Sequence, residues 1–299
     1  MPDALRLLIA PGLYLGTVLV CAWAAGRPTR GLAVGVAAVG LALPWLTPPI
    51  PLVRSTFALL EFGVLARTLD LVGHAPRPLL GRLWHLAGVV DTRKTRVIPP
   101  DLPLAVLGRV VGFGALCLAG LGVAFAASYL EGPAGWALRW TGGMVCVYAL
   151  VDGGFGAVRI YYSLLGVHVP VLHRDPIVSK TIGEFWGQRW NRVVGGWLAE
   201  HCHRPLAARG HGALGVLAAF TVSALLHVHF AWAGGGWRVG ALMGSFFLVQ
   251  GVLVLVERGI GVKRWPDLVA RVWTITMMIG TTPIFVEAFL RLFPVPLPG

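Results

Sequence analysis

Two polar side chains in this apolar chain have the chemistry to take part in catalysis. Asn191 closes the stretch EFWGQRWN, and His227 lies within the apolar run FTVSALLHVHF. A carboxamide N–H can donate a hydrogen bond to a developing negative charge, and an imidazole can accept a proton near neutral pH. An ionisable side chain deep in an apolar segment is costly unless it faces a cavity or a partner. His227 is therefore a candidate functional residue.

Each of these residues also has a purely structural interpretation. Asn191 can be an incidental residue of a helix that anchors the chain at the membrane surface. His227 can be a core histidine that bonds a backbone carbonyl or Ser223, which lies one helical turn earlier on the same face. His229 points in roughly the opposite direction. The choice depends on the elements that carry these side chains.

Those elements are expected to be membrane helices. The chain has 299 residues, of which 56% are hydrophobic and 13% charged, and a soluble protein has about 25% charged residues. Several apolar stretches reach the roughly 20 residues that cross a bilayer. The composition predicts an all-α, polytopic membrane helix bundle that forms a single domain over residues 1–299. The eight expected spans are 5–25, 31–46, 52–72, 103–129, 136–165, 212–232, 238–256 and 268–292.

The basic residues predict how the chain is oriented. They gather in alternate loops, so the positive-inside rule places those loops in the cytoplasm of a cell-membrane protein with both chain ends outside. The same rule accounts for the formal charge of +12, and dispersed basic residues do not indicate nucleic-acid binding. The first apolar run is expected to be a retained span, because it is long for a signal peptide and only Arg6 precedes its apolar part.

The predicted cytoplasmic segment 166–211 is too long to be a simple turn. Over about residues 181–207 its apolar side chains recur at helical spacing, which predicts an amphipathic helix in the plane of the membrane surface. Asn191 lies at the edge of this apolar stripe and can turn toward the bundle. The stripe consists of Trp186, Trp190, Val193, Val194 and Trp197.

Other polar residues leave alternatives open. Asp152, in the fifth expected span, either lines a chamber or pairs with Arg159. Asp152 and His227 together could serve a proton-coupled transporter, although the chain lacks the repeated halves common in carriers. The stretch His201, Cys202 and His203 contains zinc-type ligands, but no second pair follows at the usual spacing, so no metal site is expected.

The two stretches together resemble the paired signature of membrane-bound O-acyltransferases, in particular their wax synthase-like branch. That family carries F-W-x-x-x-W-N before a membrane helix that ends in S-x-x-x-H, and residues 185–191 and 223–227 match both motifs. The resemblance is closest over residues 175–232. Val228 departs from the family, where an acidic residue often follows the histidine, and this argues against a carboxylate partner for His227.

The resemblance implies transfer of an acyl group from a thioester donor, acyl-CoA, to the hydroxyl of a lipophilic alcohol held among membrane lipids. An alcohol is a poor nucleophile, so His227 is expected to act as the general base. Asn191 is expected to bond the thioester carbonyl or to orient the imidazole ring. Acyl-CoA is a co-substrate, and no cofactor is expected. The expected substrate-binding residues are Ser223, Trp186, Trp190, Phe185, Asp152, Lys180 and Arg189. The phosphates of the donor need cations, and those available are Lys180, Arg189, Arg93, Lys94, Arg96 and Arg192.

Overall fold

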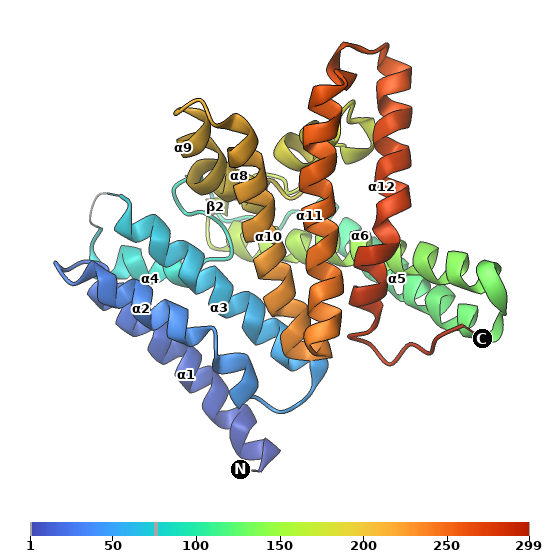
Figure 1. Cartoon of the computed structure of the whole chain (residues 1–299). Coiled ribbons are helices and arrows are strands. Elements are labelled where there is room, and N and C mark those ends of the chain that lie inside the picture. Colours follow the sequence, from blue (N-terminus) through green and yellow to red (C-terminus); the bar gives the residue numbers. More distant parts are fainter. Residues whose placement is uncertain (1, 75–76, 299) are drawn as a thin grey trace. The chain divides into compact units, whose positions relative to one another are not determined.

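Helices make up almost all of the regular structure in the computed structural model, which describes residues 2–74 and 77–298 (Figure 1). The strands among these residues are β1 (Arg96–Val97) and β2 (Val167–His168), which pair antiparallel. The predicted all-α class is confirmed. The contacts divide the chain into two compact units, one containing residues up to Thr95 with His229–Gly240, and the other containing Arg96–Val228 with the residues from Ala241 onward. The single domain therefore stays a prediction.

Six helices of the described residues are long and apolar enough to cross a membrane, against eight expected. The helix α2 (Arg30–Gly40) has 11 residues and is about 16 Å long, roughly half the thickness of the hydrocarbon core. The helix α3 (Pro51–Val72) has the length but buries Glu61, Arg67 and Asp70. The chain is a multi-pass membrane protein. The six helices are α1 (Asp3–Ala24), α5 (Leu104–Ala126) with its short extension to Tyr129, α6 (Gly132–Leu164), α10 (Gly212–Gly235), α11 (Trp237–Gly259) and α12 (Asp267–Leu290).

The first unit contains α1, α2, a short 3₁₀ turn (Leu43–Leu46), α3 and α4 (Leu79–Ala87). Small side chains, among them Ala22, Ala33 and Ala37, are fully buried in its core. Such residues let membrane helices approach each other closely, which gains van der Waals contact where lipid supplies no hydrophobic driving force.

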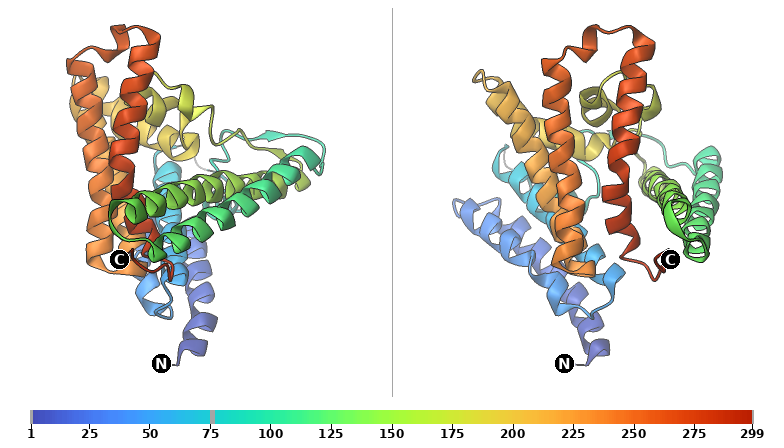
Figure 2. Two further views of the ribbon diagram at one scale, coloured as in Figure 1. Left: turned by 90° about the vertical axis from the view of Figure 1, so that its right-hand side faces the viewer. Right: turned by 45° about the vertical axis from the view of Figure 1, so that its right-hand side comes forward.

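In the second unit, α5 and α6 run side by side as an antiparallel pair (Figure 2). They are closest where Gly120 faces Gly142: a Cβ atom on Gly120 would lie 2.6 Å from the Gly142 carbonyl oxygen and 2.7 Å from the Cys146 nitrogen. Backbone atoms cannot yield to a side chain there, so glycine is required. The helix α12 packs against α6, where the buried Arg139 pairs with Glu287 at 2.9 Å.

The segment before α10 corrects the expected continuous helix over 181–207. It consists of α7 (Ile182–Glu184), a π-helical turn (Phe185–Arg189), α8 (Arg192–Leu198), a second π-helical turn (Ala199–His203) and α9 (Arg204–Ala207). The helix is interrupted because Trp190 is extended and Asn191 is left-handed, with a φ of 36°. Tryptophan spacing predicted one stripe, but asparagine tolerates this conformation and begins a new helix there.

Candidate active site

A cavity of about 1020 Å³ lies within the second unit. Its walls come from α5, α6, α10, α11 and α12, from residues 175–177 and from the broken segment before α10. One face of α12, from Thr274 to Val286, lines it over about 18 Å at 1.5 Å per residue. Most lining side chains are apolar or aromatic and only a few are polar, which is typical of a site for a lipophilic ligand.

His227 lines this cavity from α10, and the tautomer of its neutral ring can be inferred from its partner. Nδ1 lies 2.7 Å from the Ser223 carbonyl oxygen. A carbonyl oxygen only accepts hydrogen bonds, so Nδ1 carries a proton and donates it; in the neutral imidazole, Nε2 then holds the lone pair. No described residue hydrogen-bonds to Nε2. The Phe247 ring stacks on the imidazole with centroids 3.8 Å apart and an interplanar angle of 24°. These contacts hold the ring in a fixed orientation with Nε2 left unbonded among the described residues.

Ser223 also lines the cavity and is buried. It is the expected partner of His227, but the bond goes to its backbone carbonyl and not to its hydroxyl. The interpretation of His227 as a core histidine bonded to a backbone carbonyl therefore accounts for one ring nitrogen, Nδ1, and leaves Nε2 unexplained. Nε2 remains available for chemistry.

Asn191 lines the same cavity from the broken segment. Its Oδ1 accepts a hydrogen bond of 3.2 Å from the Val194 backbone N–H and so caps α8. With the oxygen bonded in this way, the amide group keeps its two N–H donors for a ligand. Asn191 and Asp175 are the two non-glycine residues of the described chain with positive φ, and both line the cavity. Left-handed strain of this kind gathers at functional sites.

Phe185, Trp186 and Trp190 line the cavity as expected. Trp186 is held in place by a residue that the sequence analysis missed. Its Nε1–H donates to Gln250 Oε1 at 3.1 Å, and the fully buried Gln250 donates in turn to Thr281 Oγ1 at 2.7 Å. A glutamine within an apolar run was a signal that could have identified this support.

A family sequence model matches part of the chain that lines this cavity. Residues 169–249 match the sequence model of the membrane bound O-acyl transferase family. This part of the chain is similar to the membrane-bound O-acyltransferase superfamily. The match contains Asn191, Ser223 and His227, and the resemblance to the wax synthase-like branch is confirmed by relatives of that kind.

Three curated relatives illustrate the similarity. Probable long-chain-alcohol O-fatty-acyltransferase 7 of Arabidopsis thaliana is 28% identical over 145 residues, covering 44% of this chain and 42% of that protein. Acyl-CoA–sterol O-acyltransferase 1 of the same plant is 30% identical over 129 residues, covering 39% and 37%. Long-chain-alcohol O-fatty-acyltransferase of Simmondsia chinensis is 30% identical over 107 residues, covering 32% and 29%. The chain thus spans less than half the length of these relatives.

Two cations expected at the donor phosphates bond other residues of the chain instead. Arg189 Nε lies 2.6 Å from Glu184 Oε1, and Lys180 Nζ lies 2.7 Å from Asp267 Oδ2. Neither side chain lines the cavity, whereas Arg258, at the end of α11, does. Partial burial raises the pKa of the Glu184 carboxyl, but bonds from the Lys180 N–H and from Arg189 outweigh it, and the net pKa lies below its ordinary value. Arg189 is therefore a structural partner of a charged carboxylate.

Glu257 is a second residue that the sequence analysis missed. Its carboxylate accepts hydrogen bonds of 2.7 Å from the backbone N–H groups of Ile182 and Gly183. Because Glu257 lies on α11, these bonds hold the start of α7 against that helix. The position of Phe185 and Trp186 in the cavity wall follows from this attachment.

Asp152 lies outside the cavity lining, which corrects its expected place in a chamber. It pairs with Arg109 at 3.3 Å and with His173 at 2.9 Å, and not with Arg159 as the alternative had it. Asp152 and His227 therefore do not share the cavity that a proton-coupled transporter using both would need.

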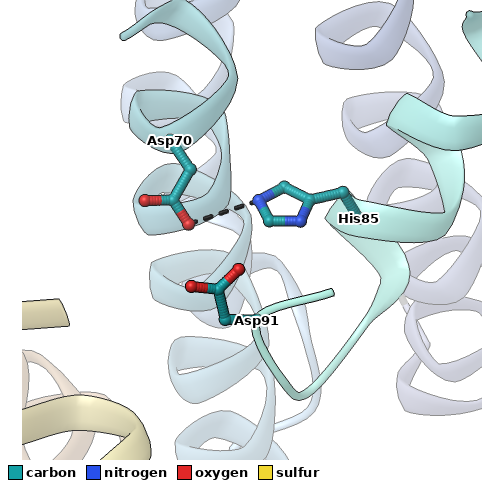
Figure 3. A group of neighbouring side chains, drawn as sticks. All are labelled: Asp70, His85 and Asp91. Carbon is teal, nitrogen blue, oxygen red and sulfur yellow. Dashed lines mark hydrogen bonds and ion pairs between the residues drawn. The ribbon is translucent and has the colours of Figure 1, made fainter. Parts of the chain in front are cut away.

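The first unit contains a buried cluster of Asp70, His85 and Asp91, whose possible metal-ligand atoms lie within 4.8 Å of one another (Figure 3). Cationic side chains already bond these carboxylates: Arg67 lies 3.0 Å and Arg93 3.3 Å from Asp70, and Asp91 bonds Arg93 at 2.9 Å and Lys94 at 3.1 Å. A guanidinium at that distance repels a metal ion. The cluster is an ion-pair network, which also accounts for Arg93 and Lys94.

The side chains of residues 201–203 lie in different surroundings. The His203 ring lines the cavity, whereas the His201 ring stacks on Trp197 with centroids 4.6 Å apart. Burial raises the pKa of the Cys202 thiol, which disfavours the thiolate that a metal would need.

Proposed function

We propose that the protein transfers an acyl group from acyl-CoA to the hydroxyl of a lipophilic alcohol, with His227 as the general base. The observation that carries this proposal is that His227, with a free Nε2, and Asn191, with free amide hydrogens, line one apolar cavity. The relatives named for long-chain-alcohol and sterol acylation support the same class of acceptor.

The reaction uses both polar groups. Nε2 of His227 takes the proton of the alcohol as its oxygen attacks the thioester carbonyl carbon. Negative charge then develops on the carbonyl oxygen, and the Asn191 N–H donates a hydrogen bond to it. Breakage of the C–S bond expels the thiolate, which takes the proton from the imidazolium. The products are an ester and free thiol, and His227 returns to its neutral state.

The two ends of the cavity suit the two parts of a thioester donor. Arg258 lies about 16 Å along α11 from Phe247, the residue that stacks on His227, at 1.5 Å per residue. A guanidinium at one end can bond the phosphates while the thioester reaches the imidazole at the other. We place Arg258 at the cytoplasmic side of the cell membrane, where the donor enters, and the alcohol enters from the bilayer.

The test replaces the proposed base. His227→Ala is expected to lower acyl transfer by about 10² to 10⁴-fold, the usual contribution of a general base. Purified protein in detergent is incubated with labelled acyl-CoAs and a panel of hydrophobic alcohols, and both labelled ester and free thiol are measured. His229→Ala, in the same helix but outside the cavity lining, is the matched control. Full activity in a monodisperse His227→Ala sample would remove His227 from the mechanism.

A further inference from the structure

A short piece of chain clamps the turn that carries Asn191. The Arg174 N–H donates to the Arg189 carbonyl at 2.9 Å, and the Arg192 N–H donates to the Leu172 carbonyl at 3.0 Å. These two bonds lie on either side of the turn formed by Trp190 and Asn191. The residue at the centre of the clamp is His173.

His173 is fixed by an acid on α6. Its side chain is buried, and Nδ1 lies 2.9 Å from Asp152 Oδ1, while Asp152 Oδ2 lies 3.3 Å from Arg109. Burial lowers the pKa of the His173 imidazole, although the Asp152 carboxylate opposes this. The ring is therefore neutral near pH 7, with Nδ1–H donating to the carboxylate. Nε2 is buried and has no hydrogen-bond partner among the described residues.

The His173 ring lies against Trp190. Their ring centroids are 4.2 Å apart with an interplanar angle of 33°. Phe185 also stacks on Trp190, with centroids 5.6 Å apart and planes within 12°. The Trp190 indole is thus held by a histidine that does not line the cavity and by a phenylalanine that does. Because Trp190 directly precedes Asn191, its orientation sets the direction of the next side chain.

We propose that His173 is a positioning residue for acyl transfer: Asp152 fixes its ring, the ring fixes Trp190, and the left-handed Asn191 is thereby kept with its amide toward the cavity. This inference rests on the proposed function, since it assigns the Asn191 amide a role in the reaction. It gives a reason for Asp152, a carboxylate within α6, to bond His173 of the loop and not to line the cavity. His173 itself touches no substrate in this arrangement, because it is absent from the cavity lining.

Two substitutions of His173 test its bond to Asp152 and its ring contact with Trp190 separately. His173→Phe keeps an aromatic ring against Trp190 but loses the bond to Asp152. His173→Asn keeps a short N–H donor for Asp152 but loses the ring. His168→Ala is the control, because His168 is an exposed histidine a few residues earlier in the same segment. All variants are full-length protein in detergent, and size-exclusion profiles confirm that each is folded.

The expected result is a loss of kcat without a loss of donor binding. Misplacing a reacting group by about 1 Å can cost about 10²-fold in rate, so His173→Phe is expected to lower kcat about 10- to 100-fold with the KM for acyl-CoA changed less than twofold. His173→Asn, which removes the ring that contacts Trp190, is expected to lower kcat at least as much, and His168→Ala to match the wild type. An unchanged kcat in His173→Phe, or a KM that rises as steeply as kcat falls, would overturn the inference.

A spectroscopic arm does not depend on the proposed reaction. The contribution of Trp190 is the difference between the fluorescence of the wild type and that of Trp190→Phe. The emission maximum of this contribution is expected to shift in the His173→Phe background and to stay unchanged in the His168→Ala background. An unshifted contribution contradicts the contact even if acyl transfer is observed. A wild type that transfers no acyl group contradicts the proposed function, whatever the fluorescence shows.

Discussion

Asn191 uses the two polar ends of its side chain for different tasks. The oxygen caps α8 through the Val194 N–H, and the amide hydrogens are left for the cavity. His227 divides its two nitrogens in the same way, since Nδ1 donates to the Ser223 carbonyl and Nε2 is free. In both residues a backbone group holds one polar atom and so determines which atom is left to react.

Substitution of Asn191 can separate its cap from its proposed catalytic role. Asn191→Asp keeps an oxygen that can cap α8 but has no N–H to donate. Loss of one donor to a developing oxyanion costs about 10² to 10³-fold in kcat, and this loss is expected for Asn191→Asp while its thermal stability stays near that of the wild type. Steady-state kinetics on labelled acyl-CoA measures it.

The control is Asn191→Gly, which fits the left-handed backbone but removes the whole side chain. Replacing the cap by glycine costs only a few tenths of a kcal/mol, so this variant is also expected to fold and to lose kcat. Wild-type activity in Asn191→Asp would mean that the asparagine serves the helix cap alone.

The α5–α6 pair shows how elements shape the site. Leu116 on α5 and Met144 and Val147 on α6 line the cavity, and Gly120 and Gly142 bring the two helices together close to these positions. The close approach is therefore part of the cavity wall. The break at Asn191 acts similarly on the other side, because it lets Trp186, Trp190 and Asn191 line one cavity from two separate helical pieces.

Gly120→Val is expected to destabilise this pair by about 1–3 kcal/mol, the usual cost of overpacking. Its Cβ would meet backbone atoms of α6 at 2.6–2.7 Å, which cannot move aside independently. Gly122→Val is the matched control, since nothing lies within 4 Å of a Cβ there. Thermal unfolding in detergent compares the two, and an equal melting temperature for both variants would show that the helices do not touch at Gly120.

At the scale of the whole molecule, the charged end of the cavity and its apolar walls suit different parts of the proposed donor. Arg258 lies at one end of the cavity lining and His227 toward the other, with apolar and aromatic walls between them. A donor with an anionic end and a lipophilic acyl chain matches this order. Lys180 and Arg189, which bond Asp267 and Glu184, are left out of it.

Arg258→Gln is expected to raise the KM for acyl-CoA about tenfold or more, because hydrogen bonds to charged groups contribute about 1.5–3 kcal/mol. The kcat at saturating donor is expected to change little. Arg264→Gln removes an exposed arginine outside the cavity lining and is expected to leave both constants unchanged. Equal KM values for the two variants would exclude Arg258 from the donor site.

The sequence alone determined the membrane class and singled out His227 and Asn191, because apolar runs and polar exceptions within them are local properties. It could not determine which atoms of these residues are free. The Ser223 carbonyl, the clamp at residues 172–174 and the Gln250 and Glu257 contacts are hydrogen bonds that a residue pattern does not reveal. The same holds for Arg258, Asp152, Lys180 and Arg189. Their roles depend on partners far away in the sequence, and only the tertiary structure brings such partners within bonding distance.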